Sequence, residues 1–233
     1  MALTLQSVTF LSPDPRRDAE FWGAVLGRSA EVDRDGILLA GTTTQVGLRF
    51  EAGPGHGAAK NRLHLHLTDG ERTQRDTIDA CIALGGRLLG SGHVPENSYA
   101  VMADPVGDEF CVIEDGNGYL TGCGPLGEVT CDGTRAVGLF WAQALGWPLV
   151  WEVGEERVIQ SPAGGTKLAW GGEPIPPDKD VDRQHFVFTV DESELEHEVD
   201  RLVSLGASLD SSTASPERTL RDPDGAPFLL RTP

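Results

Sequence analysis

One turn-and-strand pattern occurs twice in this chain, and this repeat constrains the fold more than any other feature. The first copy begins with Asp-Pro-Val-Gly at 104–107, and the second begins with Asp-Pro-Asp-Gly at 222–225. In both copies Asp-Pro favours the opening of a tight turn, glycine tolerates a positive φ, and an apolar run typical of a β-strand follows. The copies lie 118 residues apart in a chain of 233 residues, which indicates an internal duplication.

Other segments repeat at nearly the same interval. Phe-Trp at 21–22 returns at 140–141, and an Arg-x-His strand at 62–68 returns at 183–189. Offsets of 119 and 121 residues agree with the offset between the two turns. The chain is therefore predicted to consist of two homologous halves. The predicted boundaries are a first domain at 1–116, a Gly-rich linker at 117–127 and a second domain at 128–233.

Each half is predicted to contain two units in which a strand and a helix precede three strands. In the first half the strands are expected near 1–11, 30–32, 37–40, 45–50, 62–68, 87–89, 99–103 and 109–114. One helix is expected to begin at Pro15, with Asp14 as its N-cap, and to end at Gly27. A second is expected over 71–84, with Ile78, Cys81 and Ile82 facing inward.

The second half is expected to repeat this order of elements. Its last helix follows Asp191 and Glu194, whose spacing predicts a capping box at the helix N-terminus. The apolar positions then recur as far as Leu205 and Gly206, where the helix is expected to end. The predicted fold class is therefore α+β, with four βαβββ units in total.

The charge of the chain narrows the range of partners. Nineteen Lys and Arg residues against 36 Asp and Glu residues give a net charge of −17, and neither half contains a basic block. Such a surface disfavours nucleic acid and anionic membranes, so a small-molecule ligand is the expected partner of a monomer or a homodimer. The N-terminus has no signal-peptide pattern, and four cysteines without zinc-like spacing indicate reduced thiols, so the expected location is cytoplasmic.

Three motifs together resemble those of a known superfamily. They are Phe-Trp-x-x-x-Leu-Gly after the first strand, Arg-x-His-x-x-x-Thr in mid-domain and Asp-Pro-x-Gly-x-x-Phe near the end of the half. The set is similar to the glyoxalase/bleomycin-resistance/dioxygenase superfamily, also called vicinal oxygen chelate proteins, and to its glyoxalase-like domain branch. The resemblance implies two tandem domains whose curved mixed sheets form ligand-sized cups with helices outside. Each cup can form from consecutive units or from units exchanged between halves or chains.

Strand alternation assigns side chains to the two faces of each sheet. Leu63, Leu65 and Leu67 are expected to face the helix, which places His64 and His66 on the cup side. By the same reasoning, Cys111 is expected on the cup side. Asp104 and Asp222 are interpreted as turn residues, and Trp22 and Trp141 as structural residues outside the cup.

The resemblance also implies where a metal would bind. Metal-dependent relatives take His or Gln from the first strands of the units and Glu from the last strands, a donor set that suits divalent iron, nickel, zinc or manganese. In the first half these positions fall on Ser7, His64 and Cys111, and in the second half on Glu128, His185 and Leu229. Neither half supplies the three protein ligands typical of a catalytic metal, so no cofactor is predicted. The alternative is one divalent metal held by His64, Glu128 and His185.

The leading hypothesis is a small-molecule-binding protein without a complete catalytic metal site, which sequesters an aromatic or antibiotic-like compound. The expected ligand-binding residues are Ser7, His64, His66, Cys111, Phe50, Trp151 and Trp170, of which the three aromatic residues would stack on a flat ligand. Two rivals stay open: a metal-dependent lyase, isomerase or dioxygenase, and a non-catalytic scaffold or regulator. A minor metal-free hypothesis pairs His64 with Cys111 as base and thiol nucleophile.

Overall fold

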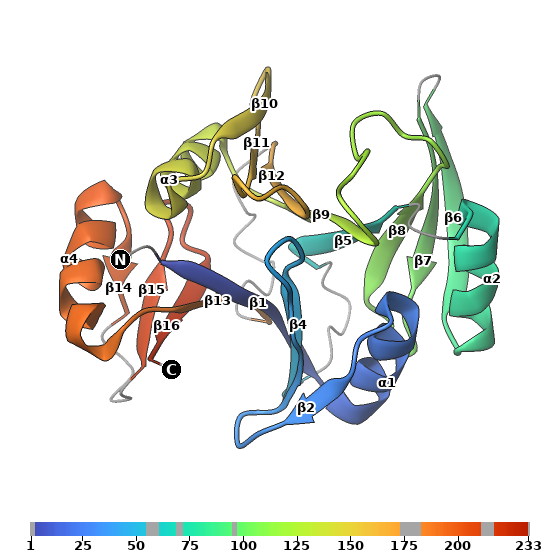
Figure 1. Cartoon of the computed structure of the whole chain (residues 1–233), viewed down its shortest axis with the longest axis horizontal. Coiled ribbons are helices and arrows are strands. Elements are labelled where there is room, and N and C mark those ends of the chain that lie inside the picture. Colours follow the sequence, from blue (N-terminus) through green and yellow to red (C-terminus); the bar gives the residue numbers. More distant parts are fainter. Residues whose placement is uncertain are drawn as a thin grey trace.

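Within the residues that it describes, the computed structural model contains two curved eight-stranded sheets and four α-helices (Figure 1). The structure describes residues 3–54, 61–68, 72–94, 97–172, 183–210 and 217–232. The elements follow the chain as four βαβββ units, which confirms the predicted fold class. No helix in these described ranges has the length and apolar character needed to cross a membrane.

The first half of the chain contains the first two units. Unit one consists of β1 (Thr4–Ser12), α1 (Pro15–Leu26), β2 (Ala30–Val32), β3 (Ile37–Leu39) and β4 (Gly47–Ala52). Unit two consists of β5 (Leu63–Leu67), α2 (Gln74–Ala83), β6 (Arg87–Val94), β7 (Asn97–Ala103) and β8 (Glu109–Ile113).

The second half contains the last two units. Unit three consists of β9 (Leu126–Cys131), α3 (Arg135–Leu145), β10 (Leu149–Val153), β11 (Glu156–Gln160) and β12 (Lys167–Trp170). Unit four consists of β13 (Gln184–Thr189), the short 3₁₀ helix η1 (Glu192–Glu194), α4 (Leu195–Leu205), β14 (Ser208–Leu209), β15 (Arg218–Arg221) and β16 (Pro227–Arg231).

Each sheet combines one unit from each half. The first sheet has the order β14-β15-β16-β13-β1-β4-β3-β2, and the second has the order β10-β11-β12-β9-β5-β8-β7-β6. The antiparallel pairs β1–β13 and β5–β9 join the halves at the centre of each sheet. The cups therefore form between units one and four and between units two and three, so consecutive units of one half do not share a sheet.

Helix α1 begins and ends as its sequence predicts. The Asp14 side chain accepts a hydrogen bond from the Arg17 backbone N–H at 3.1 Å, and Pro15 is the first helical residue. At the other end Gly27 adopts the left-handed conformation, with φ of 66°, which glycine reaches without steric cost.

The predicted start of the last helix is wrong. Asp191 makes no side-chain capping bond, and residues 192–194 form the 3₁₀ turn η1 before α4 begins at Leu195. The predicted inward position of Ile82 in α2 is also wrong, because that side chain is 47% exposed while Cys81 is fully buried. The end of α4 at Gly206 is confirmed.

Helices α1 and α3 lie between the two sheets, whereas α2 and α4 lie at opposite ends of the molecule (Figure 1). The indole of Trp22 in α1 contacts Phe110 of the second sheet, with ring centroids 4.9 Å apart. Trp141 in α3 contacts Trp170 of the second sheet and Phe188 of the first. Both tryptophans are buried in one continuous apolar core, which confirms their structural interpretation.

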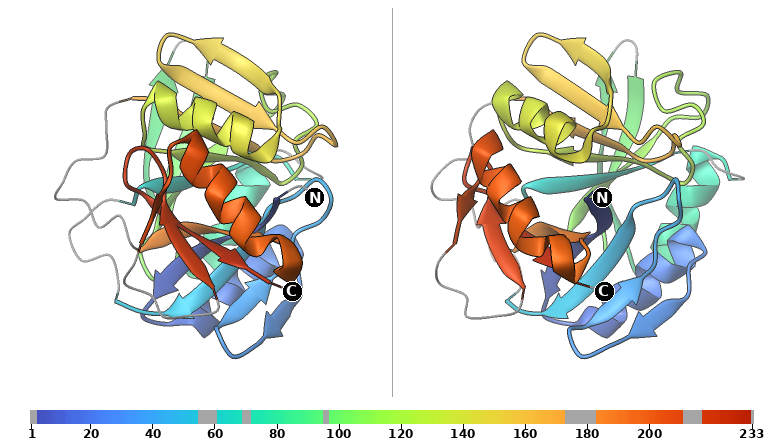
Figure 2. Two further views of the ribbon diagram at one scale, coloured as in Figure 1. Left: turned by 90° about the vertical axis from the view of Figure 1, so that its left-hand side faces the viewer. Right: turned by 60° about the vertical axis from the view of Figure 1, so that its left-hand side comes forward.

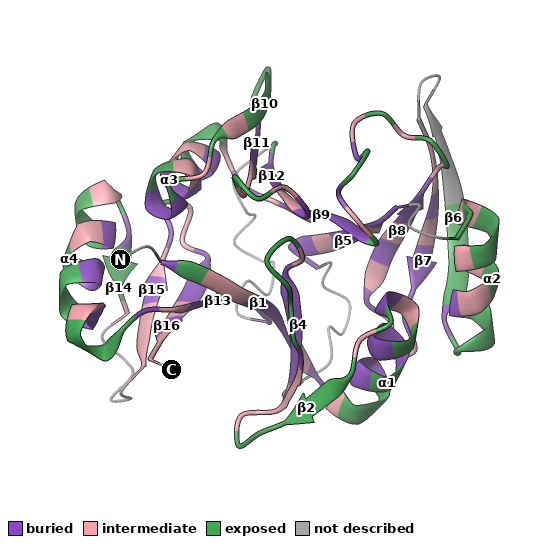
Figure 3. Cartoon of the chain, viewed as in Figure 1, coloured by how far each residue is buried: buried purple, intermediate pink, exposed green. Residues whose placement is uncertain are grey.

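The helix-facing side of each sheet supplies the rest of this core (Figure 3). In β5 the three leucines are buried and the two histidines are half-buried, as strand alternation predicts. Helix α4 lies across β14–β16 and α3 lies across β10–β12 (Figure 2). The opposite, concave face of each sheet is left for polar side chains, and it is this face that positions the candidate site.

Candidate functional site

Four polar side chains stand opposite one another across the four central strands of the second sheet. Strand pairing aligns His66 in β5 with Cys111 in β8 on one side and with Glu128 in β9 on the other. Glu128 in turn aligns with Lys167 in β12. These four residues, Cys111, His66, Glu128 and Lys167, are called the central row. Aligned residues on adjacent strands point to the same face of a sheet, so the row lines one cup.

Glu128 is the best-connected member of the central row. One carboxylate oxygen, Oε2, lies 3.0 Å from Nδ1 of His66. The other, Oε1, accepts a hydrogen bond from the Tyr119 hydroxyl at 2.5 Å. The Glu128 side chain is only 5% exposed, so these two bonds compensate for its burial.

Tyr119 comes from the segment that joins the two halves. This segment folds over the cup, where Leu120 and Cys123 pack with Ile113 of β8 into a small apolar cluster. Cys111 and Tyr119 are half-buried at the edge of the same cluster. Burial and the negative charge of Glu128 raise the pKa of the Tyr119 hydroxyl, so it remains a neutral donor. The linker thus supplies part of the site.

Lys167 ends the central row with a positive charge. Its Nζ donates a hydrogen bond to the backbone carbonyl oxygen of Tyr119 at 2.5 Å and lies 3.9 Å from the centroid of the Tyr119 ring. A cation over an aromatic face is attracted by the ring quadrupole. Lys167 therefore holds Tyr119 in place, and Tyr119 in turn binds Glu128.

His66 is held between two partners. Burial alone lowers the pKa of His66, but the Cys111 and Glu128 side chains together outweigh it and raise the pKa to about 9. The imidazole is therefore mainly protonated at neutral pH, although 22% of the side chain remains exposed to solvent. Because Nδ1 faces Glu128, Nε2 is the ring nitrogen left for Cys111.

An aromatic pair forms one wall of this cup. The Trp151 ring packs edge-on against Tyr119, with ring centroids 5.6 Å apart, and its Nε1 donates to Glu156 at 3.0 Å. Trp151 is nevertheless 43% exposed. An exposed tryptophan that is fixed by a ring contact and a hydrogen bond offers a flat apolar face to a ligand.

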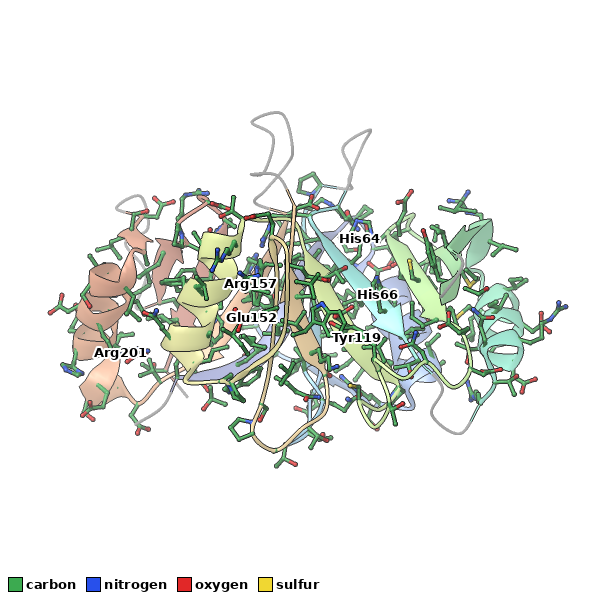
Figure 4. The ribbon with its side chains drawn as sticks, turned by 90° about the horizontal axis from the view of Figure 1, so that it is seen from above. His64, His66, Tyr119, Glu152, Arg157 and Arg201 are labelled. Carbon is green, nitrogen blue, oxygen red and sulfur yellow. The ribbon has the colours of Figure 1, made fainter. Side chains whose placement is uncertain are left out.

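A cavity of about 410 Å³ opens beside the central row. Its lining includes His64, Arg62, Thr130, Glu156 and Ala169. His64 pairs with Thr130 across the strands, one step along from His66, and its Nε2 lies 3.1 Å from the Asn61 carbonyl oxygen. Figure 4 shows His64, His66 and Tyr119 following one another along this side of the sheet. The cavity has the size typical of small-molecule sites.

The matching row in the first sheet has no ionisable side chain. Ser7 in β1 aligns with Gly47 in β4 and Val187 in β13, and Val187 aligns with Leu229 in β16. Ser7 is fully buried. Nothing in this row can exchange a proton at neutral pH, so the two cups differ in chemistry.

Ion pairs occupy the first cup instead. The Arg231 guanidinium lies 3.2 Å from Glu51 and 3.8 Å from Asp35, and Arg49 bonds Asp33 at 2.7 Å. The Arg231 pairs join β16 to β4 and to the β2–β3 turn on the opposite side of the first sheet, so they cross its cup, whereas the Arg49–Asp33 pair lies on one side. The second cup is therefore the stronger candidate site.

The structure separates residues that the sequence placed together. Ser7 belongs to the first sheet, whereas His64 and Cys111 belong to the second. Glu128 lies in the second sheet and His185 in the first, where His185 pairs with Thr9. The alternative metal set of His64, Glu128 and His185 is therefore wrong, because its members line different cups.

The predicted histidine position is also wrong by two residues. His66, not His64, aligns with both Cys111 and Glu128, and the corresponding residue of the other sheet is Val187 rather than His185. Alternating strands place both histidines on the cup face, so parity alone could not choose between them. The cross-strand register decides the choice, and it depends on pairing between the halves.

Two of the three predicted stacking residues belong to the core. Phe50 is 1% exposed and stacks on Phe10, and Trp170 is fully buried and stacks on Trp141. Both point to the helix side of their sheets, so they cannot contact a ligand in a cup. Trp151 alone of the three lies at a cup.

The central row does not fit the metal site that the superfamily implies. His66 and Glu128 are suitable donors, but Lys167 places an ammonium group where a fourth strand would contribute a ligand. No cluster of three or more His, Cys, Asp or Glu side chains suited to a metal occurs within the described ranges.

Two residues of the site were missed by the sequence analysis. Lys167 lies 120 residues after Gly47, so the repeat offset could have identified its place in the row. Tyr119 lies in a segment rich in glycine, which carries no periodic signal and was interpreted only as a linker. Its role depends on how this segment folds back over the cup.

Comparison with known proteins places this architecture in a family. The family model described as "Glyoxalase-like domain" matches the chain twice, at residues 7–113 and 128–231. Glyoxalase I from Zea mays is similar in structure, with a TM-score of 0.67 at 16% sequence identity over 98% of this chain and 92% of that one.

A putative dioxygenase from Bacillus subtilis gives a TM-score of 0.59 at 15% identity, over 98% of this chain and 84% of that one. Identities this low establish a shared fold and no shared activity. No curated protein matches the sequence. Because the family model covers both halves almost completely, the chain belongs to the glyoxalase-like domain family.

Proposed function

We propose that this protein binds an aromatic small molecule in the cup of the second sheet and does so without a catalytic metal. The observation that carries the proposal is the central row, in which Lys167 takes the fourth position and both carboxylate oxygens of Glu128 are already bonded. A divalent cation at this place would have to displace Tyr119 and tolerate an ammonium group nearby.

The chemistry of the cup supports an aromatic ligand. Trp151 offers an exposed ring face that the edge-on contact with Tyr119 holds in place, and the adjoining cavity of about 410 Å³ can accept a ligand-sized body. His66 and Lys167 supply positive charge in a strongly acidic protein, which favours a ligand carrying a carbonyl or acidic group. Sequestration of such a compound requires no further chemistry.

A thermal-shift screen with a panel of aromatic compounds tests this proposal. A ligand that binds only the folded protein must raise the Tm. For each hit, we expect Trp151→Ala to weaken binding by about fivefold, because an aromatic contact contributes about 1 kcal/mol. Val203→Ala is the matched control, since Val203 is about as exposed as Trp151 but lies on α4, outside the cup.

Equal affinity of every hit for the wild type, Trp151→Ala and Lys167→Ala proteins would place the ligand elsewhere. A panel without any hit would also contradict the proposal.

A further inference from the structure

The central row places a nucleophile, a base and an orienting carboxylate next to one another. Cys111, His66 and Glu128 stand on three adjacent strands, with the imidazole in the middle. Glu128 Oε2 bonds Nδ1 of His66 at 3.0 Å and leaves Nε2 for the thiol. Carboxylate–imidazole–nucleophile arrangements of this kind activate a cysteine or serine in unrelated folds.

We propose that Cys111 is a nucleophile that adds to aromatic α,β-unsaturated carbonyl compounds, with His66 as its base and Glu128 as the residue that orients the base. This inference rests on the proposed function, because it assigns the chemistry of a ligand bound in the same cup. It differs from simple sequestration in that the ligand becomes covalently attached.

The addition balances without any further reactant. The proton of the Cys111 thiol passes to Nε2 of His66, which gives the thiolate and imidazolium pair that the raised pKa of His66 reflects. Sγ then forms a bond to the β-carbon of the alkene while the carbon–carbon π bond breaks. The electron pair moves to the α-carbon and carbonyl oxygen, and the imidazolium returns the proton to the α-carbon. The product is a thioether, and neither an oxidant nor a leaving group is needed. A soft thiol and one proton shuttle are sufficient for this reaction.

The surroundings of Cys111 distinguish it from the other three cysteines. Cys111 is half-buried, while Cys81, Cys123 and Cys131 are buried to 0%, 1% and 5% exposure. Burial raises the pKa of each of these three thiols, which makes them poor nucleophiles. The chain thus contains its own unreactive thiol controls.

Glu128 is held in place by more than His66. The Tyr119 hydroxyl fixes the second carboxylate oxygen, and Lys167 fixes Tyr119. Tyr119 and Lys167 therefore act as positioning residues for the proton shuttle. The apolar cluster of Ile113, Leu120 and Cys123 beside the thiol offers an environment for the hydrocarbon part of the ligand.

Reaction of the full chain with trans-cinnamaldehyde, followed by peptide mass spectrometry, tests the inference. We expect an adduct on Cys111 to form before any adduct on the other three cysteines. His66→Gln should slow its formation at neutral pH by about 100-fold, because a positioned general base typically contributes at least this much. His197→Gln is the matched control, since His197 is an exposed residue of α4 outside the cup, and its rate should equal that of the wild type.

Similar rates of adduct formation on all four cysteines of the wild type would contradict the inference. An equal effect of His197→Gln and His66→Gln on the rate would also overturn it. The saturated analogue 3-phenylpropanoic acid separates this inference from the proposed function, because it keeps the aromatic ring and an acidic group but has no alkene with which to form an adduct. Binding of the analogue without any Cys111 adduct from cinnamaldehyde leaves the proposed function intact and refutes the thiol chemistry. Adduct formation that depends on His66, without binding of the analogue, would support the thiol chemistry and contradict the proposed function.

Discussion

At the residue scale, equivalent positions of the two halves have diverged in their polar contacts. Trp22 and Trp141 occupy the same place in α1 and α3, and both are buried. Nε1 of Trp22 donates to the buried Asp104 carboxylate at 3.1 Å, whereas no bond to Nε1 of Trp141 occurs within the described ranges. Asp104 accepts three backbone N–H bonds from its own turn as well, which confirms it as a turn residue and links the turn to the helix.

This difference predicts unequal costs for the same substitution. Trp22→Phe removes a donor from a buried carboxylate, so it should lower the free energy of unfolding by about 1–3 kcal/mol more than Trp141→Phe does. Both variants lose a similar volume from the core, so the second is a matched control for packing. Urea unfolding of the three proteins measures the difference, and equal losses would show that the Trp22–Asp104 bond contributes nothing.

At the element scale, the first turn of α1 packs against the turn between β7 and β8. Asp18 of α1 is fully buried. Burial raises the pKa of Asp18 to about 8, and the nearby Asp104 and Asp108 carboxylates act in the same direction. The Arg183 guanidinium pairs with Asp108 and offsets part of the negative charge that gathers there. The folded chain therefore holds a proton on Asp18 that the unfolded chain releases.

The titration of Asp18 makes the free energy of unfolding depend on pH. Between the unfolded pKa of 3.8 and the folded value of about 8, the folded state binds one more proton, so stability falls as pH rises. Asp18→Asn removes this titration and should flatten the decline by up to about 1.4 kcal/mol per pH unit. Asp79→Asn on the exposed face of α2 is the control.

Urea unfolding between about pH 5 and about pH 8 measures this slope. His66 also loses stabilisation above its unfolded pKa of 6.5, so the comparison must be between variants and not between pH values alone. Parallel curves of the free energy of unfolding against pH for the wild type and Asp18→Asn would contradict the explanation that Asp18 holds a buried proton.

At the scale of the whole molecule, much of the fold is predictable from local sequence. Helix caps such as Asp14 and Gly27, strand alternation in β5 and the repeat offset each depend on nearby residues, and all three are confirmed. The pairing of the units is not predictable in this way. Connectivity alone permits more than one pairing of the four units, and only the structure shows that β5 pairs with β9 and β1 with β13.

The candidate site depends on that pairing, which explains why the sequence predicted it only in part. Strand alternation places Cys111 of the first half on a cup face, and Glu128 of the second half was identified only as a possible metal ligand. The structure brings them to either side of His66 through a contact between the halves. The metal-ligand positions were sought within each half, so each set mixed residues of two cups. Lys167 was missed for the same reason.

The most direct test of the metal-independent site is the metal content of the wild type and of Lys167→Glu after incubation with iron, nickel, zinc or manganese. We expect the wild type to retain no stoichiometric metal after desalting. Lys167→Glu should gain affinity for zinc or nickel, because a carboxylate replaces the ammonium group beside Glu128 and His66. One metal ion per wild-type chain that is lost on His66→Ala or Glu128→Ala would contradict the account.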